Sequence, residues 1–547
     1  MNDIISQIQF SLKNYADLPA LSDYQQKSMT YEEVGKTIAK LHLYFELFEI
    51  NPGDKIALIG KNSGHWANIY LATLTFGAVI VPILPEFKAE DSERIIHHSD
   101  AQLLFIEDHF FDQMETAHLP QLKAIFNLSE FELLYSQKNF ENLHDNYERQ
   151  LKFKYPNGIN VQELDFRIPE PEDLAVISYT SGTTGFSKGV MLPHRSLNGN
   201  IEFARDNMPL KSGNRIVSFL PLAHTYGCAF EFLFPFTLGC HITFLTKTPA
   251  PKIIMKAFAE IQPHLILSVP LIIEKIYKTK IVPALQKPMT AFLMKMPILK
   301  SIVHQKIKQQ LMEVFGGNFK ELIIGGAAFN PEAEKFFRLI KFPFTIGYGM
   351  TECGPLIGYA SWDTTVLGGS GRPVDALEVK IDSPDPEHTI GEIICRGSHL
   401  MLGYYKNPEA TQATIDQDGW LHTGDLGLMD AQNNILIKGR SKSMILGPSG
   451  KNIFPEEIES LLLNMPMVAE ALVVDRNGKL TALVYFDHAE MEQNHLGENQ
   501  IPALLQQYKK AVNQKLPGYM QIKDIKLQVE AFEKTPKRNI KRFLYQQ

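Results

Sequence analysis

The chain has 547 residues, several times the length of a typical single domain, so we expect two or more packed units. Hydrophobic residues make up 44% of it and charged residues 21%, a composition typical of globular proteins that excludes disordered and fibrous chains. The net charge of -7 provides no basic field for holding a nucleic-acid backbone. Nucleic acid is therefore not an expected partner.

Cysteine usage and the N-terminal segment favour a cytoplasmic protein. The four cysteines are scattered, with no CxxC pair and no zinc-ligand spacing, so neither disulfides nor structural zinc are expected. The first residues lack the basic stretch and apolar run of a signal peptide. The one membrane-like stretch, residues 69–85, is interrupted by Gly77, Pro82 and Pro85. It predicts a short helix followed by a buried strand rather than a transmembrane span.

The first two thirds of the chain alternate short β-branched runs with helix-length segments. This pattern predicts an α/β fold with largely parallel strands. The runs are KIALIG (55–60), VIVPIL (79–84), LLFIE (103–107), LAVISYT (174–180), RIVSFLPL (215–222), HITFL (241–245), LILSV (265–269) and ELIIGG (321–326).

A glycine-rich loop, YTSGTTGFSKGV at residues 179–190, follows one of these strands and precedes a helix-like segment, HRSLNGNIEF. Its glycines permit close backbone approach, its hydroxyl groups offer donors, and Lys188 offers a cation. Such a loop can wrap a polyphosphate, the alternative being a glycine-rich surface turn. It is not a Walker A loop, because Lys188 lies between Ser187 and Gly189.

The segment at residues 281–308 is both apolar and basic. We expect a buried amphipathic helix pair there. The alternative is a helix pair that lies against a membrane surface, which would make the protein peripheral to the membrane.

From about residue 367 the sequence pattern is typical of β-hairpins. Further along, it predicts a helix followed by two strands that are joined by an Asn477-Gly478 turn. We therefore predict an N-terminal domain at residues 1–439, containing a β-rich subdomain at about 367–439, and a small α+β C-terminal domain at 440–547.

The glycine-rich loop resembles the phosphate-binding signature of the adenylate-forming superfamily, which includes acyl-CoA synthetases, luciferases and peptide-synthetase adenylation domains. Further motifs of that superfamily follow in the expected order. They are LPLAHTYG (220–227), GGAAFNPE (325–332), IGYGMTECGP (346–355), GWLHTGDLG (419–427) and KGRSKSMI (438–445). Taken singly, each has an ordinary structural explanation, but their joint order and spacing favour the superfamily.

The resemblance implies roles for individual residues. Lys188, Thr351 and Glu352 are expected to be catalytic, with Glu352 holding Mg²⁺, and Tyr348 is expected to stack on adenine. Asp425 and Arg440 would contact the ribose, and Lys442 would be the hinge of a mobile C-terminal domain. The expected ATP- and AMP-binding set is Thr180, Ser181, Gly182, Thr183, Thr184, Gly185, Gly326, Ala327, Gly347, Tyr348, Gly349, Met350, Asp425 and Arg440.

Other positions are predicted for the acyl group and for coenzyme A. His224 and Tyr226 are candidates for the acyl site, although a hydrogen-bonded, half-buried histidine is an equal alternative. The aromatic run at residues 226–239 is expected to be mostly core, the alternative being the wall of an acyl tunnel. Gly450, Lys451 and Asn452 resemble the loop of the superfamily that meets the pantetheine channel.

The C-terminal tail departs from the superfamily pattern. It reads EKTPKRNIKRFLY, which puts Asn539 where a catalytic lysine is expected. Lys537 or Lys541 could supply the cation instead, or the tail could be a solvated basic segment. Because a cation near developing charge lowers a barrier by a few kcal/mol, this substitution bears directly on catalysis.

The resemblance, closest to bacterial long-chain fatty acid-CoA ligases, implies ATP-dependent, AMP-forming activation of a fatty acid followed by transfer to coenzyme A. The implied cofactors and substrates are ATP, Mg²⁺, coenzyme A and a fatty acid. Two alternatives keep the adenylation but change the acceptor: an acyl-AMP ligase and an acyl-acyl carrier protein synthetase. An alternative of another class is a catalytically weak protein that binds ATP and fatty acid, for which Asn539 is the support.

Overall fold

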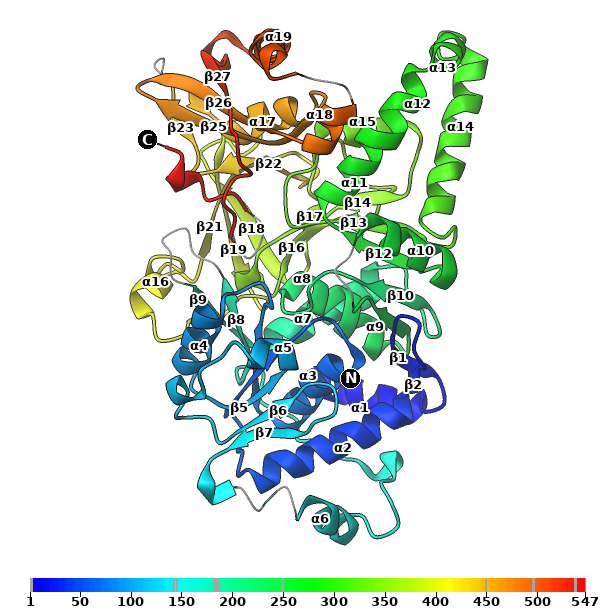
Figure 1. The fold of residues 1–547 in the computed structure, drawn as a ribbon, viewed down its shortest axis with the longest axis vertical. Helices are drawn as coiled ribbons and strands as arrows, with labels where there is room; N and C mark the ends of the chain where they lie inside the picture. The colour runs from blue at the N-terminus through cyan, green and yellow to red at the C-terminus, as the bar shows by residue number, and fades with distance from the viewer. Residues whose placement is uncertain are drawn as a thin grey trace.

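The structure is a computed structural model that describes residues 3–140, 143, 146–180, 187–246, 250–447, 450–493, 497–535 and 539–546. Figure 1 shows a large body made by the first part of the chain and a smaller unit made by the C-terminal part at one end of it. The predicted mixed α/β class is confirmed. In the described residues no helix has both the length and the hydropathy to cross a membrane.

The largest sheet has the strand order β20-β9-β8-β4-β3-β5-β6-β7. Its central strands are parallel, as predicted, whereas β7, β9 and β20 are antiparallel, so the sheet is mixed. The strands are β3 (Lys55–Ile59), β4 (Val79–Ile83), β5 (Ala101–Ile106), β6 (Ala124–Asn127), β7 (Leu133–Ser136), β8 (Leu174–Thr180), β9 (Lys188–Pro193) and β20 (Gly403–Tyr404). The membrane-like stretch forms the end of helix α3 (Gly64–Phe76), a left-handed Gly77 and strand β4, as the sequence predicts.

Strand β9 was not predicted. The helix-like segment after the glycine-rich loop is helix α7 (His194–Asn207), as predicted, but β9 lies between the loop and this helix and pairs antiparallel with β8. The described residues on the two sides of the loop, Thr180 and Lys188, are therefore paired strand residues.

Two smaller sheets complete the α/β body, in the orders β10-β11-β1-β2 and β12-β13-β14. Their strands are β1 (Pro19–Asp23), β2 (Met29–Thr30), β10 (Arg215–Ser218), β11 (His241–Phe244), β12 (Leu265–Ser268), β13 (Glu321–Ile324) and β14 (Phe344–Ile346). The helices that pack around these sheets include α1 (Ile4–Asn14), α2 (Tyr31–Leu47), α4 (Ala89–His98), α6 (Tyr147–Lys154), α10 (Pro251–Ile261) and α15 (Pro331–Leu339).

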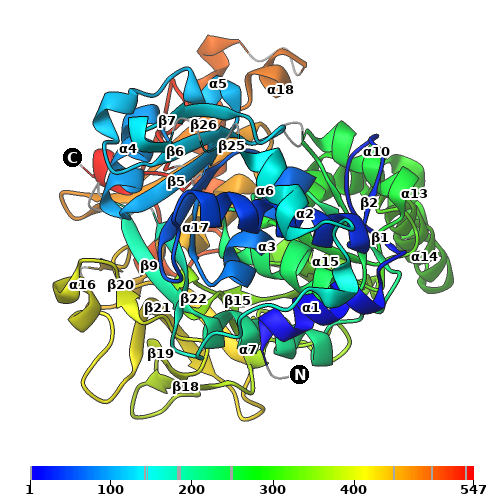
Figure 2. The same ribbon diagram turned by 90° about the horizontal axis from the view of Figure 1, so that it is seen from below.

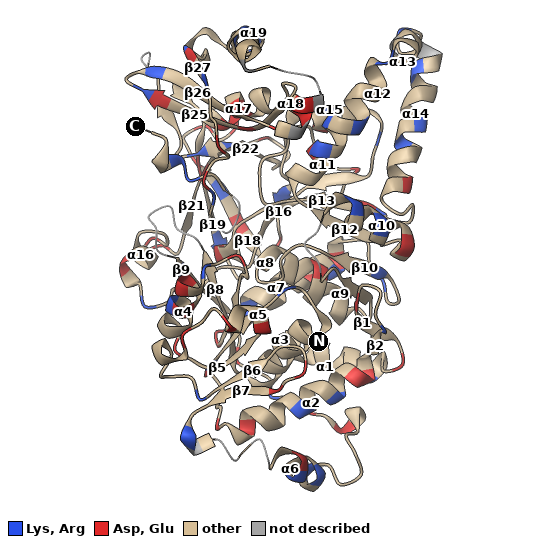
Figure 3. Cartoon of the chain, viewed as in Figure 1, with Lys and Arg blue, Asp and Glu red and all other residues tan. Residues whose placement is uncertain are grey.

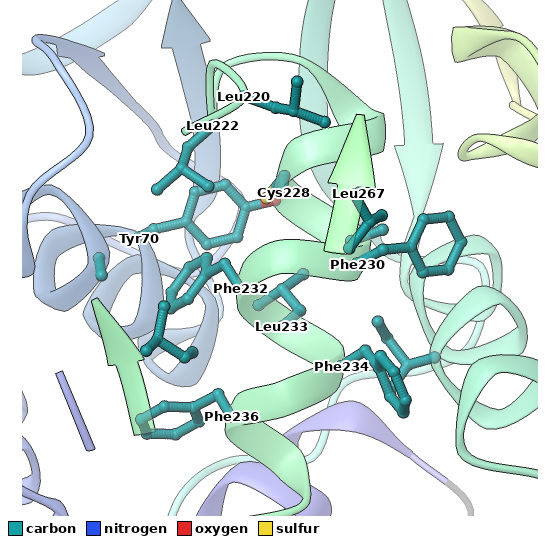
Figure 4. Close-up of a cluster of buried hydrophobic side chains, with 14 of the residues drawn as sticks. Tyr70, Leu220, Leu222, Cys228, Phe230, Phe232, Leu233, Phe234, Phe236 and Leu267 are labelled. Atoms are coloured by element: carbon teal, nitrogen blue, oxygen red, sulfur yellow. The ribbon is translucent and has the colours of Figure 1, made fainter. Parts of the chain in front are cut away.

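The aromatic run is core, as predicted. It forms a short helix α8 (Thr225–Gly227), a π-helical turn at Cys228–Leu233 and helix α9 (Phe234–Thr237). Figure 4 shows Phe230, Phe232, Phe234 and Phe236 projecting from this segment to different sides, and all four are buried.

The predicted β-rich part follows. Strands β15 (Tyr348–Gly349), β16 (Leu356–Tyr359) and β17 (Arg372–Pro373) make one sheet, and β18 (Leu377–Asp382), β19 (Gly391–Gly397), β21 (Leu421–Met429) and β22 (Ile435–Arg440) make another, with α16 (Pro408–Gln412) between β20 and β21.

The C-terminal part has its own core. Helix α17 (Pro455–Leu463) and helix α19 (Ile501–Asn513) pack with strands β25 (Val468–Arg476), β26 (Lys479–Phe486) and β27 (Asp524–Leu527). The predicted turn lies between β25 and β26, and Asn477 and Gly478 both have positive φ. The large core reaches Ile437 and the second begins at Ile445, which is compatible with the predicted domain boundary, and the boundary stays a prediction.

The segment at residues 281–308 is helical, as predicted, but the prediction that it is buried is wrong for its outer part. Helices α12 (Val282–Gln286), α13 (Pro288–Leu293) and α14 (Pro297–Val314) continue α11 (Pro270–Ile276) into a helical hairpin. Figures 1 and 2 both place α13 and α14 at the rim of the molecule. Leu285, Ile307 and Leu311 pack on the core, whereas Met289 and Phe292 on α13 are exposed.

Candidate active site

The glycine-rich loop is anchored at both ends in the largest sheet. Thr180 and Lys188 face each other across β8 and β9, and the Thr180 hydroxyl donates to the Lys188 carbonyl at 3.5 Å. The predicted positions Ser181, Gly182, Thr183, Thr184 and Gly185 lie outside the described residues. The hairpin therefore determines where the loop begins and ends.

Tyr404 links the two predicted catalytic charges. The Lys188 ammonium lies 4.6 Å from the centre of the Tyr404 ring, and the Tyr404 hydroxyl donates to Glu352 Oε1 at 2.8 Å. Burial and the neighbouring Glu352 carboxylate raise the pKa of Tyr404, so its hydroxyl stays protonated as a donor. One side chain thus contacts both Lys188, on the sheet, and Glu352, on a different segment.

The second polar group joins Tyr348 to the two predicted ribose contacts. The Tyr348 hydroxyl donates to Asp425 Oδ2 at 2.8 Å, and Arg440 Nε lies 3.0 Å from Asp425 Oδ1. Asp425 and Arg440 are opposite each other in β21 and β22. Burial raises the pKa of the Asp425 carboxyl, and Arg440 and Tyr348 counteract that rise. The structure therefore brings together three residues that lie 15 to 92 positions apart in the chain.

Two glycine-containing turns lie side by side at the carboxyl ends of parallel strands, the edge where open α/β sheets bind ligands. Gly326 follows β13, and Gly347 follows β14 and donates to the Ile324 carbonyl at 2.9 Å. Gly326 has φ of +87°, and a Cβ at Gly349 would lie 2.1 Å from the Pro355 carbonyl oxygen. Gly326 and Ala327 are exposed, so this edge is open to a ligand.

Helix α7 holds the turn that carries Thr351 and Glu352. The Asn200 amide nitrogen donates to the Cys353 carbonyl at 3.1 Å, and its oxygen accepts from Leu356 N at 2.9 Å. The Glu352 carbonyl accepts from Met401 N at 2.9 Å. Two separate parts of the chain, helix α7 and the segment that contains Met401 and Tyr404, thus support Glu352 and its turn.

An apolar pocket lies directly behind these polar groups. It reaches Ser178, two residues before Thr180, and Gly354, two residues after Glu352. Apolar walls come from helices α3 and α7 and the π-helical turn, and include Tyr70, Leu197, Ile201, Cys228 and Leu233. Figure 4 shows the Tyr70 ring directed at Cys228. The pocket leaves room for about one water molecule, roughly 20 Å³, so it must widen to admit an acyl chain.

A buried polar network supports the wall of this pocket. Glu231 is fully buried in the π-helical turn, and its Oε2 accepts from Phe219 N and Leu220 N, each at 3.0 Å. The Asn62 amide donates to the Leu220 carbonyl at 2.7 Å and accepts from Leu222 N at 3.0 Å. Burial raises the pKa of Glu231 well above its usual range, which keeps the carboxyl neutral.

The predicted acyl-site residues lie beside the pocket. His224 is the residue before α8 and is half-buried, whereas Tyr226 packs beneath Gly325 and donates to the Ile323 carbonyl at 3.1 Å. Their roles stay predictions, and the pocket itself is lined by Ala223 and Thr225 instead.

The C-terminal candidates lie on a different unit. Lys442 is exposed just after β22, and Gly450, Lys451 and Asn452 lie at and beside a two-stranded turn where the Lys451 ammonium is 4.8 Å from the Tyr519 ring centre. Asn539 N donates to Thr535 Oγ1 at 3.3 Å, and Lys541 pairs with Glu533 at 3.4 Å. Lys537 lies outside the described residues. None of these roles is tested by the geometry.

The carboxylates of the candidate site suit a Mg²⁺ ion that is bound together with a nucleotide. The described residues contain no group of three or more His, Cys, Asp or Glu side chains that could hold a metal ion by themselves. Glu352 is a half-buried carboxylate beside the loop flanked by Lys188. One carboxylate with phosphate oxygens and waters is a usual coordination set for Mg²⁺, so the residues present fit it.

Tyr404, Tyr70, Asn62 and Glu231 were not among the predicted site residues. Tyr404 reaches the site through the pairing of β20 with β9, more than two hundred residues earlier in the chain. The GYYK segment that contains it carries no glycine-loop or charge pattern that would have marked it.

The chain thus has a large mixed α/β body, a β-rich part, a small C-terminal unit and a polar site at the edge of the sheets, the architecture expected from its resemblance to adenylate-forming enzymes. Residues 8–405 match the family model described as AMP-binding enzyme. The chain belongs to the AMP-binding enzyme family.

Named relatives and solved structures agree with this assignment. The chain is 28% identical to a long-chain-fatty-acid–CoA ligase of Escherichia coli O6:H1, over 86% of this chain and 82% of that protein. It is 26% identical to a chloroplastic long-chain-fatty-acid–[acyl-carrier-protein] ligase of Arabidopsis thaliana, over 88% and 76% of the two chains. Its fold matches the crystal structure of an anthranilate CoA ligase in complex with anthranoyl-AMP, with a TM-score of 0.78 and 20% identity, over 99% of this chain and 96% of that one.

Proposed function

We propose that this chain activates a fatty acid, most simply a long-chain one, by forming an acyl adenylate from ATP, and then transfers the acyl group to coenzyme A. The observation that carries the proposal is the contact between a polar site and an apolar pocket. Ser178 and Gly354 line the pocket, while Thr180 and Glu352, two residues away from them, belong to the polar site. A molecule with a carboxylate at one end and an aliphatic chain at the other suits this boundary.

In the first step a carboxylate oxygen attacks the α-phosphorus of ATP, the bond between the α-phosphorus and the bridging oxygen breaks, and pyrophosphate leaves. Lys188 would neutralise charge that moves toward pyrophosphate, and Tyr348, Asp425 and Arg440 would hold the nucleoside. Glu352, oriented by Tyr404, would hold Mg²⁺, which when bound neutralises phosphate charge.

In the second step the coenzyme A thiolate attacks the carbonyl carbon of the acyl adenylate. A carbon–sulfur bond forms, the carbon–oxygen bond to phosphate breaks, and AMP leaves. The named relatives include both a CoA ligase and an acyl-carrier-protein ligase, so the acceptor is the part of the proposal that most needs a direct measurement.

The experiment is a panel of acids from acetate to stearate, scored for pyrophosphate, AMP and acyl product with no acceptor, with coenzyme A and with acyl carrier protein. We expect pyrophosphate release with a fatty acid and acyl-CoA only when coenzyme A is present. Acyl-AMP that persists with coenzyme A present would indicate an acyl-AMP ligase. An acyl product formed only with the carrier protein would indicate an acyl-acyl carrier protein synthetase. ATP and fatty-acid binding without pyrophosphate release would contradict adenylation altogether.

Substitutions at and near Asn539 test whether the chain is a fully active enzyme or a catalytically weak one. We expect Asn539→Lys to increase the rate of pyrophosphate release by up to about tenfold, since a cation is added near the proposed reacting phosphate. Lys537→Ala and Lys541→Ala, measured in the same assay, identify any basic residue that acts in its place. If none of the three changes alters the rate, this tail does not act in adenylation.

A further inference from the structure

The tip of the helical hairpin presents large apolar side chains to solvent. Met289 is 72% exposed and Phe292 is 62% exposed on α13, and Met296 is exposed in the turn that follows. In both views of the chain these helices lie at the rim of the molecule, away from the candidate active site (Figures 1 and 2). The hairpin therefore carries apolar area that the fold does not bury.

The charge around this tip has one sign. Residues 275–312 contain eight lysines and no aspartate or glutamate, within a chain whose net charge is -7. Lys287, Lys295 and Lys300 are exposed close to the apolar side chains. Figure 3 shows blue segments in this hairpin and red near the base of α14. The lysines lie before α12, in the turns on both sides of α13 and in α14, and Glu313 lies near the end of α14.

We infer that this tip binds the surface of a membrane that contains anionic lipids. Phe292 and the methionines would enter the region between headgroups and acyl chains, while the lysines would pair with lipid phosphates, their alkyl stems lying along the apolar surface. A projecting tip with apolar residues at its end suits insertion into a bilayer, whereas a folded acidic partner would need a broader face to contact. The inference goes beyond the proposed function and does not depend on it.

The test is co-flotation of the full chain with vesicles of phosphatidylcholine, alone or with added phosphatidylglycerol. We expect binding only to the anionic vesicles, weakened by high salt. The double variant Phe292→Ser/Lys295→Glu should bind at least about tenfold more weakly, because it removes the aromatic anchor and reverses one charge.

The matched control is Phe153→Ser/Lys152→Glu. Phe153 is 84% exposed beside the exposed Lys152 on α6, which lies at the far end of the molecule from α13 in Figure 1. It makes the same chemical changes and should leave vesicle binding unchanged. Circular dichroism of both variants shows whether each remains folded.

Two outcomes would overturn the inference: no binding of the wild-type chain to anionic vesicles, or an equal loss of binding in the α6 control. Binding of a labelled acyl carrier protein that depends on Phe292 and Lys295, without vesicle binding, would assign the tip to an acidic protein instead. Acyl-AMP formation from a water-soluble acid, measured on the same variants, keeps this result separate from the proposed function, since the tip variant should retain that activity.

Discussion

The two halves of the candidate site differ in how much of their geometry is already formed. On the nucleotide side, Tyr348, Asp425 and Arg440 are hydrogen-bonded or ion-paired to each other, and Lys188, Tyr404 and Glu352 form a second linked group. On the proposed acyl side, side chains from several helices and strands leave a volume of only roughly 20 Å³ in the pocket. The proposed nucleotide side is therefore pre-organised, whereas the proposed acyl side would have to rearrange to accept a substrate.

The first prediction tests the pre-organised side where it is most buried. Asp425→Ala should reduce the rate of pyrophosphate release by about 10²–10⁴-fold. It removes the charge-assisted contacts of the Asp425 carboxylate with Tyr348 and Arg440, roughly 1.5–3 kcal/mol each, and so releases the two other side chains that would hold the nucleoside. The assay is pyrophosphate release at saturating acid, with nucleotide binding measured by calorimetry.

The control is Asp382→Ala, an exposed aspartate on β18 of the same sheet. It should leave both measurements unchanged. Full activity in Asp425→Ala would mean that the nucleoside binds elsewhere and that the two halves cannot be compared in this way.

The second prediction concerns Tyr404, whose hydroxyl and ring make separate contacts that two substitutions can remove in turn. Tyr404→Phe should lower the rate of pyrophosphate release about tenfold and raise the Mg²⁺ concentration needed for half-maximal rate, because Glu352 loses its donor. Tyr404→Leu should lose a further few-fold, since it also removes the ring beneath Lys188.

Tyr405→Phe is the matched change next to it, because the Tyr405 hydroxyl donates to Asp100 at 2.7 Å, away from the site. A rate loss in Tyr404→Phe without any shift in the Mg²⁺ dependence would assign Tyr404 a purely structural role.

The same contrast explains what could be read from the sequence. Tyr348, Glu352 and Asp425 lie within contiguous motifs, where residue type and spacing alone mark them. Tyr404 and Tyr70 reach the site only through strand pairing and helix packing between distant segments, which local patterns do not encode. Strand β9 was missed because Gly189 and Pro193 interrupt its pattern, and the exposed hairpin was missed because an apolar, basic helix has the same sequence whether a partner covers it or not.

The third prediction concerns the side that must rearrange. Leu233→Ala enlarges the pocket, so kcat/KM should shift toward longer acids, by about tenfold in the ratio of the two neighbouring chain lengths. The acid panel measures this shift. Leu103→Ala on β5 is also fully buried but lies outside the pocket lining, and should lose comparable stability without changing the preference. An unchanged preference in Leu233→Ala would remove this pocket as the acyl site.

The smallest expected effect is on stability, at the wall of the same pocket. A carboxyl whose pKa is higher in the folded state binds its proton more tightly there, so the stability that Glu231 contributes falls as pH rises above its ordinary pKa of 4.5. Glu231→Gln cannot ionise and keeps an oxygen for Phe219 N and Leu220 N. The difference in melting temperature, variant minus wild type, should therefore increase with pH above that value.

Glu530→Gln, at an exposed position of the C-terminal part, should show no such trend. A melting-temperature difference that is constant with pH in Glu231→Gln would mean that Glu231 is ionised in the folded protein. Its contacts to Phe219 N and Leu220 N would then be charge-assisted hydrogen bonds, which are stronger than those of a neutral carboxyl. The wall of the pocket would in that case be held more rigidly than the proposed acyl side requires, and the contrast between the two halves would be smaller.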